Sequence, residues 1–163
     1  MDSERTFLLK SLTTQRQHVL GALEGLTEVD LRRPMLPSGW HCLGLVQHLT
    51  RSVEIFWFRA VMAGEDISHA VTDEMFKTEW QVPTDVSAGE IFSAYGRAIE
   101  RADAIFEATA LDAPPTYWPE HRWPTWHLTE CREIMLHVIT ETACHAGHLD
   151  AARELIDGSQ WIV

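Results

Sequence analysis

The chain has 163 residues, a hydrophobic content of 45% and a formal net charge of -11 at pH 7. This length and composition predict one globular domain spanning residues 1–163. The negative charge argues against binding to phosphate backbones. No run of about 18 consecutive apolar residues predicts a membrane span, and the N-terminal residues lack the basic-then-apolar layout of a signal peptide. We therefore expect a soluble, cytoplasmic protein without a nucleic-acid or membrane partner.

The first predicted helix covers residues 2–25, and the segment that follows is a connector. Segment 27–39 contains Arg33-Pro34 and Pro37-Ser38-Gly39. Proline lacks an amide hydrogen and clashes with the preceding helical turn, so the helix cannot continue through it. Apolar residues of the helix recur at three-, four- and seven-residue intervals, as one buried face requires. They are Leu8, Leu12, Val19, Leu23 and Leu26.

A second helix is predicted over residues 40–63, with Gly64 as its C-terminal stop. Trp57 and Phe58 lie beside its core face and are candidates for a subunit contact. The next segment, 64–83, has mixed charge and weak periodicity, which predicts a long surface loop. The apolar pattern of the helix rests on Leu45, Leu49, Ile55 and Phe56.

A third helix is predicted to follow Ser87 and Glu90, which have the spacing of a capping box. The run 112–125 carries four prolines and two tryptophans, which predicts a second long loop. A fourth helix is predicted over 129–156, closed by Gly158 in a left-handed cap. The third helix presents Ile91, Tyr95, Ile99, Ala102 and Phe106 on one face. Near the second loop, Trp118, Trp123 and Trp126 are expected to cover a pocket or to seal one end of the helices.

The fold class expected from these elements is an all-α four-helix bundle. No segment shows the period-two alternation of a strand, and no internal repeat is found. Long loops between helices two and three and between helices three and four permit crossover connections. The pattern alone therefore leaves the up-down order of the helices open.

Two polar residues, Glu141 and His145, interrupt the apolar stripe of the fourth helix. A carboxylate buried without a partner is unfavourable, so Glu141 needs a compensating cation or a raised pKa. The spacing of four residues places both side chains on one helix face, about one turn apart. This arrangement suits two ligands of one metal ion. The stripe they interrupt consists of Ile134, Val138, Leu149, Ala152 and Ile156.

His48 occupies the corresponding stripe of the second helix and can supply a third ligand. Two imidazole nitrogens and one carboxylate oxygen form the ligand set of a catalytic zinc or related divalent ion, with positions left for water or substrate. The alternative is that these histidines are ordinary hydrogen-bonded core residues.

Other titratable residues near the pair leave the ligand set open. His137 precedes Glu141 by four residues and His148 follows His145 by three, so either could replace a ligand. Since a ligating imidazole needs a fixed hydrogen-bond partner, we favour a supporting place behind the ligands for His148. Cys144 adjoins His145, but successive helix residues point about 100° apart, so it is expected to face elsewhere. No role is assigned to the loop histidines His41, His121 and His127.

The three cysteines, Cys42, Cys131 and Cys144, form no C-x-x-C pair. They fit neither a disulfide framework nor a structural zinc cluster, and they predict a reducing compartment.

The two helices that carry these residues resemble those of the DinB-like superfamily. In the second helix the motif is Leu45-Val46-Gln47-His48-Leu49, which follows Ser38-Gly39-Trp40. In the fourth helix the run Glu141-Thr142-Ala143-Cys144-His145-Ala146-Gly147-His148-Leu149-Asp150, ending in Arg153-Glu154-Leu155-Ile156-Asp157-Gly158, is similar to the actinobacterial mycothiol-transferase-like branch. The resemblance covers nearly the whole chain.

The resemblance implies a four-helix bundle with up-down-down-up order and a three-residue metal site, commonly zinc or nickel, that faces an open cleft. Many relatives use three histidines. Here the first ligand of the last helix is Glu141, as in the related mycothiol-dependent maleylpyruvate isomerases, so the implied site is His48, Glu141 and His145. His148 stands where other members have glutamine. A homodimer is usual for the family.

The resemblance also implies that the metal binds the sulfur of a low-molecular-weight thiol such as mycothiol and presents the thiolate to a small electrophile. On this hypothesis the protein is a thiol S-transferase and its own cysteines take no part. A hydrolase or isomerase is the alternative, because an open divalent site also activates water. Its base would be a further buried carboxylate, for which the sequence offers only Glu54 and Glu133 as nominal candidates. A third possibility is a non-catalytic stress-response or binding module that the metal stabilises.

Overall fold

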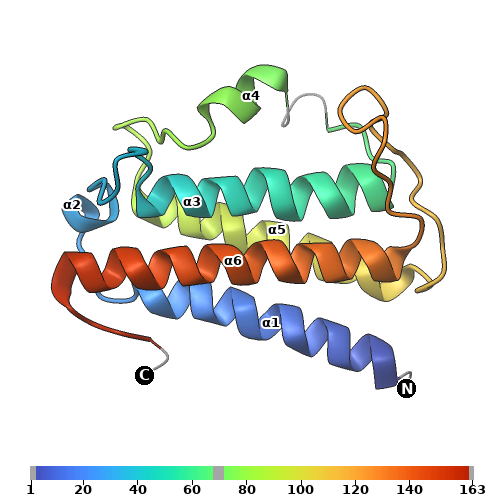
Figure 1. Ribbon diagram of the computed structural model, residues 1–163, viewed down its shortest axis with the longest axis horizontal. Coiled ribbons are helices and arrows are strands. Elements are labelled where there is room, and N and C mark those ends of the chain that lie inside the picture. The colour runs from blue at the N-terminus through green and yellow to red at the C-terminus, as the bar shows by residue number, and fades with distance from the viewer. Residues whose placement is uncertain (1–2, 68–71, 162–163) are drawn as a thin grey trace.

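The computed structural model describes residues 3–67 and 72–161, and these residues form helices and loops without any strand. Four long helical segments lie side by side, and two short helices lie at their edges (Figure 1). The all-α prediction is therefore confirmed for the described part of the chain. The long segments are α1 (Ser3–Leu23), α3 (Cys42–His48) continuing into η1 (Leu49–Met62), α5 (Ala88–Ala108) and α6 (Cys131–Asp157), and the short ones are α2 (Glu28–Leu31) and α4 (Asp73–Thr78).

Helix α1 packs against α6 through the predicted apolar face. Leu12 and Val19 are fully buried, whereas Leu26 lies beyond the end of the helix and is only partly buried. The helix ends two residues earlier than predicted, and Gly25 has a φ of 79° that glycine adopts without strain. The predicted connector also contains α2, a single turn capped by Thr27, whose side chain accepts a hydrogen bond from the Asp30 amide.

The second long helix begins one residue after His41, whose imidazole accepts a hydrogen bond from the Gly44 amide and caps the helix. From Leu49 onward its backbone is π-helical; the Ala63 amide, for example, donates to the Phe58 carbonyl at 3.0 Å. Trp57 and Phe58 are both buried within the chain, at 3% and 0% exposure. The expectation that these two side chains form a subunit contact is therefore wrong. They pack inside because η1 is flanked by α5 and α6.

The prediction of a surface loop over residues 64–83 is wrong for its second half. Helix α4 forms there, capped by Thr72, and Glu79 is buried. The chain after α4 is fixed to α3: the Gln47 side-chain amide donates to the Glu79 carbonyl at 2.6 Å. A Cβ at position 44 would lie 2.1 Å from the Trp80 carbonyl oxygen, so Gly44 is what allows this close approach.

The last two long helices agree closely with the sequence. Ser87 and Glu90 form the predicted capping box at the start of α5, and α6 ends at Gly158 with a φ of 79°. The proline-rich run between them contains no helix. None of the helices that the structure describes is both long and apolar enough to cross a membrane.

Candidate metal centre

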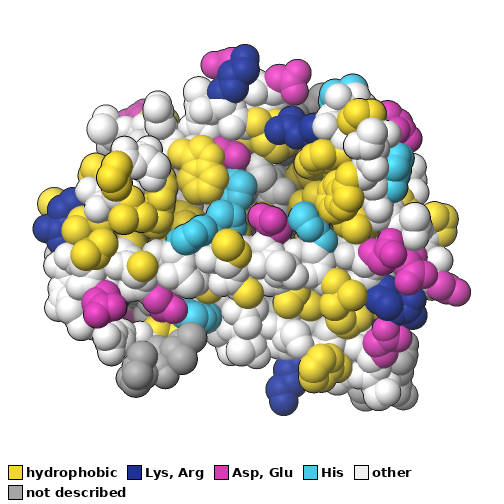
Figure 2. Space-filling view, in the orientation of Figure 1, with side chains coloured by type: hydrophobic (Ala, Val, Ile, Leu, Met, Phe, Trp, Pro, Cys, Tyr) yellow, Lys and Arg dark blue, Asp and Glu magenta, His cyan; other side chains and the backbone are white. Residues whose placement is uncertain are grey.

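The α3–η1 junction and the middle of α6 bring together the three predicted ligands. One donor atom from each of His48, Glu141 and His145 lies within 4.8 Å of the others. The imidazole rings of the two histidines meet edge to face, with 4.8 Å between their centroids. In Figure 2, histidine and acidic side chains gather at the centre of the face shown, with hydrophobic side chains on both sides. The residues that sequence spacing paired thus converge on one point.

His48 is held in a fixed orientation by residues on both sides. Its Nδ1 lies 2.9 Å from a carboxylate oxygen of Glu79, and the other oxygen of that carboxylate accepts a hydrogen bond from the Ser52 hydroxyl. The Trp80 ring stacks on the imidazole at 4.3 Å between centroids and 17° between planes. With Nδ1 donating to Glu79, Nε2 is the ring nitrogen left with a lone pair to act as a ligand.

The Nε2 atom of His48 is buried and has no hydrogen-bond partner. Among the residues that the structure describes, Tyr95 Oη is the one other buried side-chain N or O atom in this condition. Buried polar atoms nearly always have a partner, and an exception at converging donors indicates a ligand or ion. The donor set of two nitrogens and one carboxylate oxygen therefore fits a divalent metal ion.

Glu141 enters the site as a carboxylate. The neighbouring imidazole of His145, with Nε2 3.7 Å from a Glu141 oxygen, lowers the pKa of Glu141 below its ordinary value, and His137 and His48 add to this effect against the opposing effect of burial. The other ring nitrogen of His145, Nδ1, lies 3.4 Å from Nδ1 of the exposed His148. His148 is thus placed to fix the His145 ring from behind.

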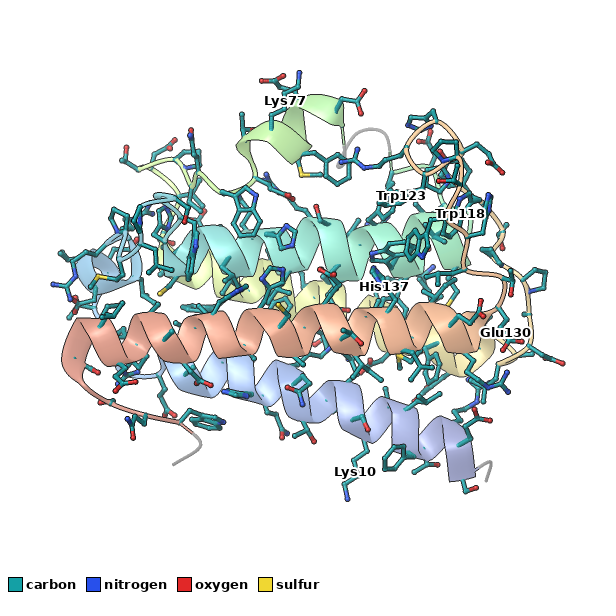
Figure 3. The ribbon with its side chains drawn as sticks, in the orientation of Figure 1. Lys10, Lys77, Trp118, Trp123, Glu130 and His137 are labelled. Atoms are coloured by element: carbon teal, nitrogen blue, oxygen red, sulfur yellow. The ribbon has the colours of Figure 1, made fainter. Side chains whose placement is uncertain are left out.

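His137 is not one of the three converging donors; it lines the same cavity as His48 and Glu141 and packs among aromatic rings. Its imidazole contacts Trp57 edge to face, with centroids 4.6 Å apart, and lies 5.3 Å from Trp126. Burial lowers the pKa of His137 below its ordinary value, although Glu141 opposes this shift. Figure 3 shows His137 rising from α6 toward Trp118 and Trp123.

The remaining candidates lie outside the site. Glu54 is buried in an ion pair with Arg16, and the Glu133 carboxylate accepts hydrogen bonds from the Thr129 amide and hydroxyl ahead of α6. Cys144 is exposed, whereas burial raises the pKa of both Cys42 and Cys131 to about 11.

The buried carboxylate near the ligands is Glu79, which the sequence analysis did not single out. Its position depends on contacts between α3 and a segment about 30 residues further along the chain. A six-residue helix carries too little periodicity to reveal such burial. The one local signal is Thr72 with acidic residues after it, a helix start that we did not recognise.

Two cavities adjoin the three donors. One, of about 410 Å³, is lined by His48 and Glu141 together with aromatic residues of η1 and the second loop. The other, of about 340 Å³, is lined by Trp40, Trp80, Gln81, His145 and His148. His48, Glu141 and His145 would hold a metal ion here, and each of the two cavities is lined by at least one of these three residues.

The fold and the geometry of the site thus define the class of protein: it is all-helical and carries an open candidate site for a divalent metal ion. The chain matches the family described as mycothiol S-transferase over residues 7–158, and it belongs to that family. Neither a curated protein nor a solved structure gives a significant match.

Proposed function

We propose that the protein is a metal-dependent thiol S-transferase that joins mycothiol, or a thiol of the same kind, to a small electrophile. The observation that carries the proposal is the unpartnered Nε2 of His48, buried beside two further donors in a chain of the mycothiol S-transferase family. His48, Glu141 and His145 would hold zinc or nickel. A bound divalent metal deprotonates a coordinated thiol near neutral pH, which supplies the attacking thiolate.

The protein's own residues would orient the ligands and shape the space around them. Glu79 and Ser52 fix the His48 ring so that Nε2 is available, and His148 has the same relation to His145. Such hydrogen-bonded partners raise ligand basicity and hold the ring orientation. The thiol and the electrophile would each occupy one of the two cavities that the ligand residues line.

The geometry bears on one way in which a hydrolase could act at this site. A carboxylate could serve as general base for a metal-bound water, and Glu79 is the buried carboxylate next to the ligands. Both of its oxygens are engaged, one with His48 Nδ1 and the other with the Ser52 hydroxyl. In the proposed function this carboxylate therefore orients a ligand and does not act as a general base.

We further propose that the chain forms one domain, residues 1–163, with up-down-down-up helix order. The packing of α6 on α1 and of α5 on η1 (Figure 1) supports this topology. The family resemblance also leads us to propose a cytoplasmic homodimer without nucleic-acid or membrane partners. Sedimentation or light scattering of the purified protein tests the dimer.

Elemental analysis combined with a transfer assay tests the proposed function. We expect about one divalent ion per chain in the native protein and none in the His48→Ala and His145→Ala variants, because two remaining ligands bind weakly. His121→Ala, which changes an exposed loop histidine, is the matched control. Metal-dependent consumption of mycothiol with an electrophile supports the transferase. A metal-loaded protein without thiol turnover would contradict it, and substrate hydrolysis or metal-dependent stability alone would then identify one of the two alternatives.

A further inference from the structure

The cavity that Glu141 lines has a largely aromatic wall. It is lined by His48 and Glu141 at the metal centre and by aromatic residues from η1, α4 and the second loop. Its volume of about 410 Å³ falls within the range of small-molecule sites, roughly 300–1,000 Å³. We call it the tryptophan pocket and define its aromatic wall as Phe56, Trp57, Phe76, Trp123 and Trp126.

The wall is packed in place before any ligand arrives. Trp57 is 3% exposed and stacks on Trp123, with 5.3 Å between centroids and 15° between planes. Trp126 meets Trp123 edge to face at 5.6 Å. Trp118 does not line the cavity but supports it from outside, with its ring 6.1 Å from Trp123 and 5.7 Å from Trp126. Because the rings are ordered by one another, a ligand pays little conformational entropy to use them.

One positive charge lies on the wall of this pocket. The guanidinium of Arg122 lies over the Phe76 ring, 3.7 Å from its centroid, and both residues line the pocket. Its acidic neighbour, Asp73, is 3.9 Å away and 85% exposed, so this ion pair is weak. Arg122 therefore retains hydrogen-bonding capacity for an anionic group at this edge of the pocket.

We infer that the tryptophan pocket binds the electrophile and selects planar, electron-poor aromatic compounds, with an anionic substituent placed against Arg122. Aromatic faces are electron-rich, so they stack favourably on electron-poor rings. The inference rests on the proposed function, because a ring in this pocket lies next to the metal centre at Glu141.

An aryl chloride gives a complete reaction of this type. The thiolate sulfur forms a bond to the ring carbon that carries chlorine, and the carbon–chlorine bond breaks. Chloride leaves with the bonding electrons, and the proton of the thiol passes to the buffer. The net reaction consumes one thiol and one aryl chloride and needs no oxidant or reductant.

The preference for aromatic electrophiles is tested by comparing aryl chlorides with a non-aromatic electrophile in two tryptophan variants. The metal-loaded enzyme is assayed with mycothiol and with 4-chloro-3-nitrobenzoate, chloro-2,4-dinitrobenzene or iodoacetamide. Trp126→Leu is expected to lower kcat/KM for both aryl chlorides about tenfold, the value of one aromatic contact, and to leave iodoacetamide nearly unchanged. Trp161→Leu, the matched control at an exposed tryptophan that packs on His18 and does not line the pocket, should leave all three unchanged. An equal loss with all three electrophiles in Trp126→Leu, or no loss with any of them, would overturn the inference.

The proposed contact between Arg122 and an anionic substituent is tested with a separate variant. Arg122→Gln should raise KM for the benzoate about tenfold, as expected for loss of a charge-assisted hydrogen bond, and change KM for the uncharged dinitrobenzene much less. Arg97→Gln, at an exposed position of α5, is the control. Equal changes for both substrates in Arg122→Gln would refute the assigned role of this residue.

Direct binding separates this inference from the proposed function. If no electrophile reacts, the transferase proposal fails, and quenching of tryptophan fluorescence by unreactive 3-nitrobenzoate still tests the pocket. Saturable quenching that weakens in Trp126→Leu and Arg122→Gln, but not in Trp161→Leu, supports aromatic binding. Linear quenching of equal slope in all four proteins would overturn it.

Discussion

The second long helix carries two clusters of polar side chains. They differ in whether every buried polar atom of the helix residue has a hydrogen-bond partner within the protein. In the first, both oxygens of Glu54 accept hydrogen bonds from Arg16, at 2.7 and 2.6 Å, and Arg16 also reaches Asp103 at 2.6 Å. In the second, about two turns away, His48 is fixed at one ring nitrogen and left without a partner at the other. We call the first the closed cluster, because both Glu54 oxygens have protein partners. We call the second the open cluster, because His48 Nε2 remains available to bind an ion.

This difference shows that burial of charged or polar groups does not by itself indicate function. Glu54 is the more deeply buried residue, yet its partners come from α1, so its role is to tie two helices together. His48 is less buried but faces converging donors and a cavity. A functional site is distinguished by donors that remain available after the fold has made its own contacts.

Breaking the closed cluster should give the largest loss of stability. We expect Arg16→Leu to lower the free energy of unfolding by about 3–5 kcal/mol, because it leaves the Glu54 carboxylate buried without its partner. Denaturant unfolding followed by circular dichroism measures the loss. The double variant Arg16→Leu/Glu54→Leu should recover much of it, with metal content per folded chain unchanged. A double variant no more stable than the single one would show that the charge pair is not the cause.

Loosening the open cluster should affect metal affinity more than stability. Replacing Glu79 by Gln removes the negative charge behind His48, so we expect metal affinity to fall about 10- to 100-fold. Competition with a chelator of known affinity measures this change. Glu74→Gln, at an exposed carboxylate of α4, the helix that precedes Glu79, is the control. Unchanged affinity in Glu79→Gln would mean that His48 orientation does not depend on this contact.

The free energy of unfolding should depend on pH through His41, the residue that caps the start of the second long helix. Burial, with the nearby charge of Arg32, lowers the pKa of His41 below its ordinary value of 6.5. As pH falls below about 6.5, the unfolded chain therefore takes up a proton at this position before the folded chain does, and stability falls. Protonation would also remove the acceptor that caps the helix at Gly44.

The variant His41→Asn keeps a helix-capping side chain at this position but removes the group that titrates. Asparagine is a good N-cap and does not titrate in this range, so the variant should lose less stability between pH 7 and pH 5 than the native protein. Unfolding free energies of the metal-free proteins at a series of pH values measure the two slopes. Parallel profiles would contradict the assignment to His41.

The sequence predicts elements well where the signal is local. Helix α6 was placed within two residues at its start and one at its end, because a long apolar period and the glycine at position 158 both lie within the segment. The same holds for the capping box at Ser87. The spacing of Glu141 and His145 likewise specifies one helix face without knowledge of any other part of the chain.

Features that depend on distant contacts could not be obtained in this way. Glu79 is buried because the chain after α4 lies against α3, where Gly44 leaves space for the Trp80 carbonyl. The burial of Trp57 and Phe58 also depends on the packing of η1 against α5 and α6, so the sequence alone could not separate a core position from a subunit contact. The ligands could thus be predicted from spacing within single helices, whereas the position of Glu79, which supports His48, is set by contacts between segments far apart in the sequence.

The smallest expected effect concerns the second buried atom without a partner, Tyr95 Oη. Tyr95 is fully buried, and burial together with the charge of Glu54 raises the pKa of its hydroxyl, so it stays protonated. A hydroxyl that gains no hydrogen bond on folding contributes nothing to offset its desolvation. Tyr95→Phe should therefore leave the free energy of unfolding unchanged or raise it by up to about 1 kcal/mol.

The same logic gives the opposite result at His48, which makes the pair of variants informative. His48→Phe also removes an unpartnered atom, but that atom faces two other donors, so the variant should lose its metal ion while Tyr95→Phe keeps it. Denaturant unfolding and elemental analysis of both variants measure the contrast. A loss of more than about 1 kcal/mol in Tyr95→Phe would show that the hydroxyl does have a partner. In that case a missing partner in the structure would not establish a missing partner in solution, for His48 Nε2 as for Tyr95 Oη, and the metal site would rest on the three converging donors alone.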